Sequence, residues 1–244
     1  MEILAAGFWG FVSGAALLVG AMLGFYIGAS QRVIAATMAL GVGVLISSVA
    51  FELTDESYRQ GGLDATAIGL LTGALAFFAA DWAVNRAGGR HRKRSGRDRD
   101  DGFSKAIALG ALMDGIPESA VIGISLVGGG SVSWAFVVAV FLSNVPESLS
   151  ASAGMKKAGH SVRYVFGLWG AVVLASVVSA VLSYLFLANA PENIVAGIQA
   201  FAAGAILVML ASTMMPEAYE EGGEWVGVVT AMGFLLAFVL SQLE

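Results

Sequence analysis

The sequence predicts an all-α membrane protein with eight transmembrane helices. Three observations predict this fold class: the composition, the apolar stretches and the short connections between them. The chain of 244 residues is 57% hydrophobic and only 13% charged, with a mean hydropathy of +0.80. Soluble globular domains rarely have such values. The connections between the apolar stretches are too short to hold a further domain. Residues 1–244 are therefore expected to form a single membrane domain.

Eight stretches approach the length of about 20 apolar residues that a transmembrane helix needs. In chain order they are Ala5–Ala29, Val33–Phe51, Leu63–Val84, Phe103–Val127, Ser133–Lys156, Val165–Leu187, Ile194–Met214 and Val226–Leu243. The 32 glycines, many of them inside these stretches, are expected to let helices approach closely in lipid. The chain has no cysteine, which excludes disulfides and thiolate metal ligands.

The positive charges fall almost entirely on one set of alternate connections. Arg32 lies in the first connection, residues 86–105 flank the third, and residues 156–163 flank the fifth. Of the 13 Lys and Arg residues, only Arg59 lies in the other set. Cytoplasmic loops are enriched in Lys and Arg, so we expect these connections in the cytoplasm and both termini on the other side of the cell (inner) membrane.

The longest connection, residues 85–102, is a basic tract. Such tracts occur in patches that bind nucleic acid or anionic lipid. They also occur as plain cytoplasmic linkers that fix the orientation of a membrane protein. We interpret this one as a cytoplasmic linker, and we expect no nucleic-acid partner.

Two Pro-Glu-Ser triplets lie near the middle of the fourth and fifth stretches. Asp114 precedes the first, Pro117-Glu118-Ser119, and Ser143-Asn144 precedes the second, Pro146-Glu147-Ser148. An ionisable residue at bilayer depth costs several kcal/mol or more and indicates function by default. Proline also leaves a main-chain carbonyl without its helical partner, which is tolerated where the chain is buried or lines an aqueous cavity.

The spacing within each motif places its polar groups on one helix face. Asp114 and Glu118 are four residues apart, as are Ser143 and Glu147, and Asn144 lies three residues before Glu147; these spacings bring side chains together on a helix. If the two helices face each other, they offer carboxylate, amide, hydroxyl and carbonyl oxygens. Such ligands suit divalent cations and favour harder ions such as Mn²⁺ over soft ones. A simple network of hydrogen bonds between helices is the alternative interpretation.

Acidic residues also cluster where the second and seventh stretches end. Glu52, Asp55 and Glu56 form one group, and Glu217, Glu220 and Glu221 form the other. Carboxylates at the mouths of a pore raise the local concentration of cations. We assign both groups to a cation path, together with Met113 and Met215, and solvated loop charges are the alternative.

The sequences that follow the second and seventh stretches also resemble each other. Residues 54–62 align with 215–223 at a constant offset of 161, so that Glu56 matches Glu217, Tyr58 matches Tyr219, and both Gly-Gly pairs coincide. With the expected topology the second and seventh spans run in opposite directions. Spans 1–3 and 6–8 are therefore expected to be inverted repeats around spans 4 and 5, an arrangement typical of secondary transporters.

At these motifs the chain resembles the ZIP (Zrt/Irt-like) family of divalent-metal transporters, as a divergent member of bacterial type. The family pattern of His-Asn-x-Pro-Glu-Gly in span 4 and His-x-x-Pro-Glu in span 5 reads here as residues 114–119 and 143–147. The resemblance implies a 3+2+3 arrangement, transport of zinc or a related transition-metal ion, and metal ligation by Glu118 and Glu147. Asp114 and Ser143 occupy the positions of the usual His residues, so the nitrogen-rich zinc site of the family is absent.

The sequence leaves other functions open. A degenerate homologue acting as a sensor or scaffold, or carrying a substrate other than a metal, is one alternative. An intramembrane hydrolase would need a second acid facing Asp114, and the nearest candidate, Asp81, lies near the far end of the third stretch. We expect no enzymatic activity and no prosthetic group. The expected partners are divalent metal ions such as Zn²⁺, the lipid bilayer and a second copy of the chain in a homodimer.

Overall fold

The structure, a computed structural model, describes residues 1–84, 86 and 101–243, with the side chains of residues 101–106 left out. Most of the basic tract at 85–102 therefore lies outside the described residues. The described chain is helical and contains no β-strand. Its helices are α1 (Glu2–Met22), α2 (Gln31–Ser48), α3 (Asp55–Val84), α4 (Asp101–Ser125), α5 (Trp134–Lys157), α6 (Val162–Leu187), α7 (Glu192–Met209), α8 (Met215–Gly222) and α9 (Val226–Ser241). Short π-helical or 3₁₀ segments are η1 (Leu23–Ile27), η2 (Val49–Thr54), η4 (Val127–Gly129) and η5 (Leu210–Met214).

Serine side chains cap the N-termini of three helices. The hydroxyls of Ser30, Ser133 and Ser161 accept hydrogen bonds from the main-chain N–H groups three residues later, at the starts of α2, α5 and α6. The first N–H groups of a helix have no partner within it, and a serine at this position satisfies one of them. The local sequence thus determines where these helices begin.

Six helical stretches of the described chain are long and apolar enough to cross a membrane, and α9 is a shorter apolar helix. Large apolar side chains cover the outward faces of the peripheral helices, as at Leu75 on α3, Leu174 on α6 and Leu235 on α9. An apolar outer surface is stable in lipid and not in water. The all-helical class expected from the sequence is therefore confirmed, and these helices are compatible with the expected multi-pass membrane architecture.

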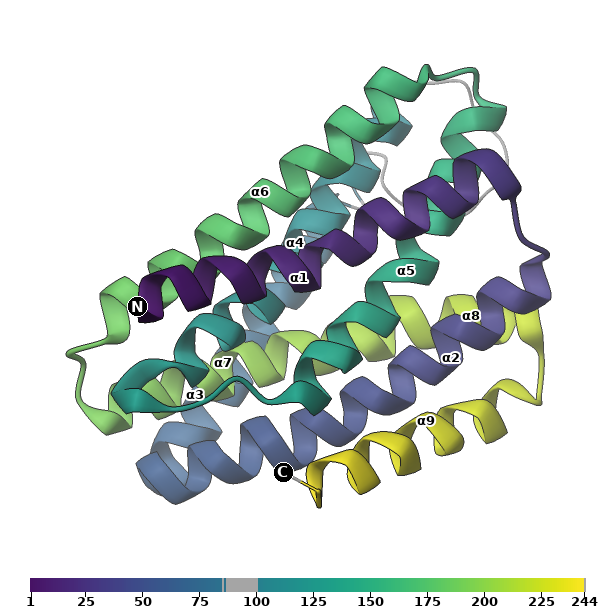
Figure 1. Cartoon of the computed structure of the whole chain (residues 1–244). Coiled ribbons are helices and arrows are strands. Elements are labelled where there is room, and N and C mark those ends of the chain that lie inside the picture. Colours follow the sequence, from purple (N-terminus) through teal and green to yellow (C-terminus); the bar gives the residue numbers. More distant parts are fainter. Residues whose placement is uncertain (85, 87–100, 244) are drawn as a thin grey trace.

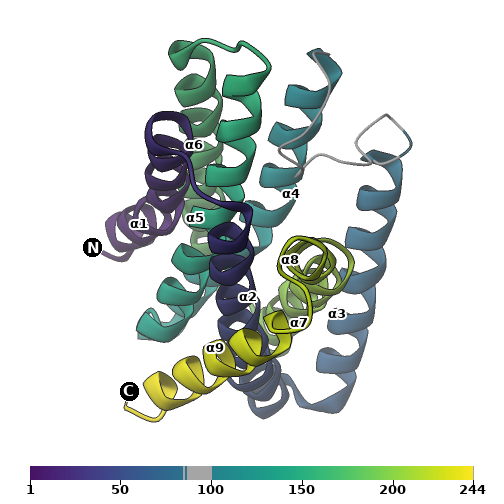
Figure 2. The same cartoon turned by 90° about the vertical axis from the view of Figure 1, so that its right-hand side faces the viewer.

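The helix connections gather at two ends of the bundle (Figure 1). The α2–α3, α4–α5 and α6–α7 connections lie together at one end, which we call the α2–α3 end. The α1–α2, α5–α6 and α8–α9 connections lie at the other, which we call the α1–α2 end. Viewed from the α1–α2 end, α1 and α6 lie on one side of the molecule and α3 on the opposite side, with α2, α4, α5 and α7 between them (Figure 2).

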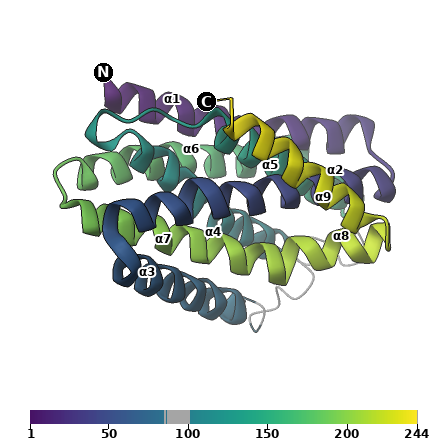
Figure 3. The same cartoon turned by 90° about the horizontal axis from the view of Figure 1, so that it is seen from below.

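Several helix pairs form the packing, and α3 with α7 is the most extensive of them. α3 runs along α7, and α9 runs along α2, as seen from below in Figure 3. α1 packs on both α5 and α6, and α4 packs on α6. The central apolar core combines side chains from α2, α5 and α7 with Val121 and Ile122 of α4. The polar residues of α4 and α5 are therefore enclosed by other helices.

α2 and α7 end in the same unusual way. α2 continues into the π-helical segment η2, and α7 continues into the π-helical segment η5, which begins 161 residues after η2 begins. Gly62 and Gly223 follow at the same offset, with φ of 73° and 78°. A positive φ is readily adopted only by glycine. π-helical turns widen the backbone and are frequent at functional sites.

Candidate functional site

The first group of buried acids lies on α4. Asp114 is 2% exposed and Glu118 is 1% exposed, and they lie four residues apart on one face of the helix. α4 stays helical through Pro117, whose missing N–H leaves the carbonyl of Met113 without its usual partner. The Met113 side chain is partly buried against the central core. α4 thus presents two carboxylates inside the bundle.

The second group lies on α5 around Pro146. Ser143 is 2% exposed and Glu147 is 7% exposed. The Ser143 hydroxyl donates to the carbonyl of Val140 at 2.9 Å, so its oxygen keeps lone pairs for another partner. Asn144 instead reaches α1, where its Nδ2 donates to the carbonyl of Ser13 at 3.3 Å. The structure therefore directs the Asn144 amide nitrogen toward α1.

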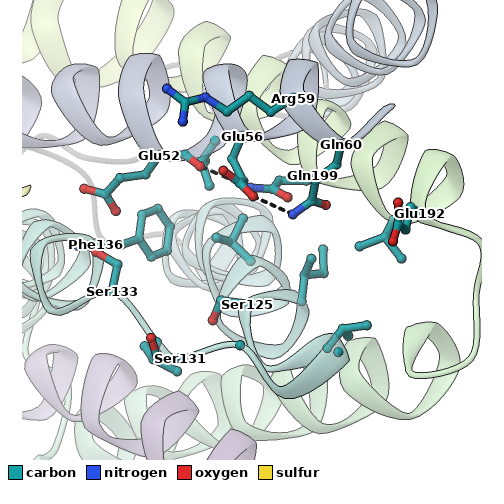
Figure 4. A pocket seen from close by; sticks show the side chains of 18 of the residues that line it. Glu52, Glu56, Arg59, Gln60, Ser125, Ser131, Ser133, Phe136, Glu192 and Gln199 are labelled. Atoms are coloured by element: carbon teal, nitrogen blue, oxygen red, sulfur yellow. Dashed lines mark hydrogen bonds between the residues drawn. The ribbon is translucent and has the colours of Figure 1, made fainter. Parts of the chain in front are cut away.

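A cavity of about 750 Å³ opens at the α2–α3 end of the bundle (Figure 4). This volume is in the range of small-ligand sites. Its polar lining includes Glu52 and Glu56, two of the three acids expected there. Asp55, the third, does not line the cavity and pairs with Arg59 at 2.8 Å. The polar lining residues are Glu52, Glu56, Arg59, Gln60, Ser125, Ser131, Ser133, Glu192 and Gln199.

The sequence analysis missed the other seven of these nine polar residues, among them Arg59, Glu192 and Gln199. Gln199 Nε2 donates to the main-chain carbonyl of Glu52 in η2 at 3.1 Å, and this bond ties α7 to the widened turn. A signal was present, because Gln199 is the only amide side chain within the apolar stretch Ile194–Met214. Buried polar groups in an apolar span usually have a specific partner or role.

The face of α4 that lines the cavity also carries the buried acids. Val121 and Ser125 line the cavity, and Glu118 and Asp114 continue the same row at spacings of three and four residues. At 1.5 Å per residue, Glu118 lies only about 4–5 Å along the axis from Val121. α5 repeats the pattern, because Phe136 lines the cavity and Val140, Ser143 and Glu147 follow on its face. One apolar layer, to which Val121, Phe136 and Val140 contribute, thus separates the cavity from the polar residues of the motifs.

A small crevice lies at the α1–α2 end. It encloses about 10 Å³ and is lined by Gln31, Ile34, Ala35, Met38, Ser150, Glu217 and Glu221. Glu217 and Glu221, expected at this mouth, line it; Glu220 does not, and Met215 is exposed. Ser150 continues the α5 face from Glu147 by three residues. The α5 face therefore reaches from the cavity to the crevice.

Among the residues that the structure describes, no group of three or more His, Cys, Asp or Glu side chains is arranged to hold a metal ion. Asp114, Glu118 and Glu147 do not come together as a three-carboxylate site. In comparisons with known proteins, no protein-family model matches the chain and no curated protein matches its sequence. The buried polar residues and the two openings are therefore the features of the molecule that indicate a function.

Proposed function

We propose that this protein transports divalent metal cations across a membrane and that it is a divergent transporter of the ZIP type. In this proposal the chain crosses the membrane eight times. α1–α3 and α6–α9 form two inverted repeats, and α4 and α5 lie between them.

The observation that carries the proposal is the continuity of the α4 and α5 faces. Each face begins at the cavity, passes an apolar layer and reaches carboxylates that are almost fully buried. A carboxylate at such depth costs free energy, and its presence therefore indicates a function by default. The α5 face then continues to the crevice at the other end. A path along these faces would lead a cation from one side of the membrane to the other.

The matching ends of α2 and α7 support the inverted repeats. Their π-helical segments and the positive-φ glycines Gly62 and Gly223 recur at the offset of 161 residues found in the sequence. The packing is consistent with the same repeat: α2 packs on α9, and the helices that would correspond to them, α7 and α3, pack on each other. Inverted repeats around a central polar site are a feature of secondary transporters.

The charge distribution supports an orientation with the cavity outside. Among the residues that the structure describes, Arg59 lies at the α2–α3 end, whereas the connections of the other end have in or beside them Arg32, Lys156, Lys157 and Arg163. Because cytoplasmic loops are enriched in Lys and Arg, the α1–α2 end would face the cytoplasm. The cavity would then receive cations from outside.

A transported cation needs weaker binding than a resident one, because it must also leave the site. Two carboxylates of α4 or the pair Glu147 and Ser143 of α5 would supply part of a coordination shell, and water would complete it, as is common for Mg²⁺ and Ca²⁺. Of the two histidines, His160 lies in the connection between α5 and α6, and His91 lies outside the described residues. The available ligands are therefore oxygens, which favour harder ions such as Mn²⁺ while still binding Zn²⁺.

Uptake into proteoliposomes tests the proposal. Purified protein is reconstituted, and uptake of Zn²⁺, Mn²⁺, Mg²⁺ and Co²⁺ is compared with empty liposomes. We expect uptake of at least one of these ions by the natural chain. Glu118→Gln and Glu147→Gln should each slow it at least tenfold, because truncating one partner of a buried charged contact costs about 2–5 kcal/mol and about 1.4 kcal/mol is tenfold.

The matched control is Asp64→Asn, which removes an exposed acid at the α2–α3 end. This variant should transport at the natural rate, and all three variants should elute as folded protein in size-exclusion chromatography. The proposal fails if no ion in the panel enters the liposomes, or if both glutamine variants transport as fast as the natural chain.

A further inference from the structure

Basic residues gather where α5 ends and α6 begins, at the α1–α2 end of the bundle (Figure 1). Lys156 and Lys157 lie in the last turn of α5, and Arg163 lies in the first turn of α6. These three residues, which we call the basic corner, are exposed, and none of them forms an ion pair with an acidic side chain of the described residues. Their positive charge is therefore available to an anionic partner.

One member of the basic corner fixes it against the end of α1. Lys156 Nζ donates to the main-chain carbonyl of Phe25 at 2.6 Å and lies 5.4 Å from the centre of the Phe25 ring. Phe25 lies in η1, the π-helical end of α1. The last carbonyls of a helix lack a donor within it and carry partial negative charge. Lys156 thus has a structural contact, and Lys157 and Arg163 remain for a ligand.

Aromatic side chains lie around the basic corner. His160 stacks on Tyr164 with ring centres 4.7 Å apart, and Tyr26 of η1 lies beside Phe166 of α6 with ring centres 6.3 Å apart. Tyr26 and Tyr164 are 60% and 41% exposed. Tyrosine is enriched where the membrane meets water, with its ring among the lipid headgroups. We therefore place the basic corner at the depth of the headgroups.

The outer face of α6 below Arg163 offers room for an acyl chain. Gly167 follows Arg163 by four residues and Gly170 follows Gly167 by three, so all three lie on one face of the helix. A Cβ atom added at either glycine would meet open space. Leu174 and Val178 continue this face and are 63% and 46% exposed. The face is thus apolar and open to lipid, with a cation at one end.

We propose that the basic corner and the outer face of α6 bind one anionic phospholipid. Its phosphate contacts Lys157 and Arg163, and one acyl chain lies along Gly167, Gly170 and Leu174. Charge complementarity carries the proposal, because an anionic headgroup matches these two cations and a zwitterionic headgroup has no net charge to offer them. The apolar face continuous with Arg163 favours a lipid over a free phosphate ion.

This lipid site is separate from the proposed cation path. Among the described residues, those that line the cavity and the crevice include none from α6. α6 instead packs on α1 and on α4, the helix that carries Asp114 and Glu118. A lipid held on the outer face of α6 would therefore lie behind the central helices and leave both openings clear.

Native mass spectrometry of the detergent-purified protein tests the proposal. Dioleoyl phosphatidylglycerol, which is anionic, and dioleoyl phosphatidylcholine, which is zwitterionic, are titrated in parallel, and Kd is taken from the fraction of protein with one lipid bound. We expect phosphatidylglycerol to bind more than about tenfold more tightly, because two basic residues meet its charge. Lys157→Gln and Arg163→Gln should each weaken phosphatidylglycerol binding about fivefold and leave phosphatidylcholine binding unchanged.

Arg32→Gln is the matched control, because Arg32 is an exposed basic residue at the same end of the bundle but on α2. This variant changes the net charge by the same amount and should bind phosphatidylglycerol as the natural chain does. Gly167→Phe fills the open space on α6 without changing any charge. It should weaken phosphatidylglycerol binding about fourfold for each acyl methylene that it displaces from the helix face.

The proposal is overturned if the two lipids bind the natural chain with the same Kd. It is equally overturned if Arg32→Gln weakens phosphatidylglycerol binding as much as Lys157→Gln and Arg163→Gln do, because the charge of the whole end would then be responsible. Displacement of the lipid by inorganic phosphate, or unchanged binding by Gly167→Phe, would overturn it as well, because the acyl chain would then have no part. None of these measurements involves a transported ion, so their result is independent of the proposed function.

Discussion

Two glycines at close contacts between helices give a quantitative prediction. Gly43 on α2 faces α9, and a Cβ atom added there would lie 1.9 Å from the carbonyl oxygen of Thr230. Gly204, its counterpart on α7, faces α3, and its Cβ would lie 2.0 Å from the carbonyl oxygen of Leu70. Gly43→Ala and Gly204→Ala should therefore destabilise the protein to a similar extent.

The size of the effect follows from these distances. Ordinary van der Waals contact begins at 3.4 Å, so each helix pair would have to separate by about 1.5 Å to accept the methyl group. The obstacle is a main-chain carbonyl, which cannot rotate away as a side chain does. Overpacking costs about 1–3 kcal/mol or more, and replacing glycine by alanine within a helix returns about 0.5–1 kcal/mol. The expected net loss is about 2 kcal/mol for each variant.

Thermal unfolding of the detergent-purified protein measures this loss. A chain of this size loses about 2–4 °C in Tm per kcal/mol, so each variant should unfold about 4–8 °C below the natural protein. Gly170→Ala is the matched control, because this glycine lies within α6 with open space where its Cβ would be, and its Tm should be unchanged or slightly higher. If Gly43→Ala and Gly204→Ala unfold at the control temperature, the helix pairs are not in the close contact described.

Two further predictions concern the path itself. Asp114→His should raise the ratio of zinc to manganese uptake, because imidazole suits Zn²⁺ better than it suits harder ions; an unchanged ratio in competition uptake would mean that Asp114 does not contact the ion. Changing Glu217, Glu220 and Glu221 together to Gln should slow uptake at low salt more than at high salt, because exposed charges are screened over about 8 Å at physiological ionic strength. Rates equal to those of the natural chain at both salt concentrations would show that these acids do not serve the path.

The positions of the helices could be predicted well from the sequence, and the polar contacts could not. The expected span Ser133–Lys156 differs from α5 by one residue at each end, because hydrophobic length and a capping serine are local signals. Asp55, by contrast, is expected to join Glu52 and Glu56 in the cation path because it lies beside them in the sequence, but it does not line the cavity and pairs with Arg59. Several nearby acids look alike in the sequence, and only the rotation of the helix decides which of them faces the cavity.

The sequence by itself determined that the chain is all-helical with apolar stretches of membrane-spanning length, that carboxylates lie near the middle of two of these stretches, and that residues 54–62 resemble residues 215–223 at an offset of 161. These properties follow from composition, helical periodicity and residue spacing, which need no knowledge of partners far along the chain. Only the tertiary structure decided that Asn144 contacts α1 and that Gln199 and Glu192 line a cavity. Those outcomes depend on how whole helices rotate and pack against one another, which no local stretch of sequence specifies.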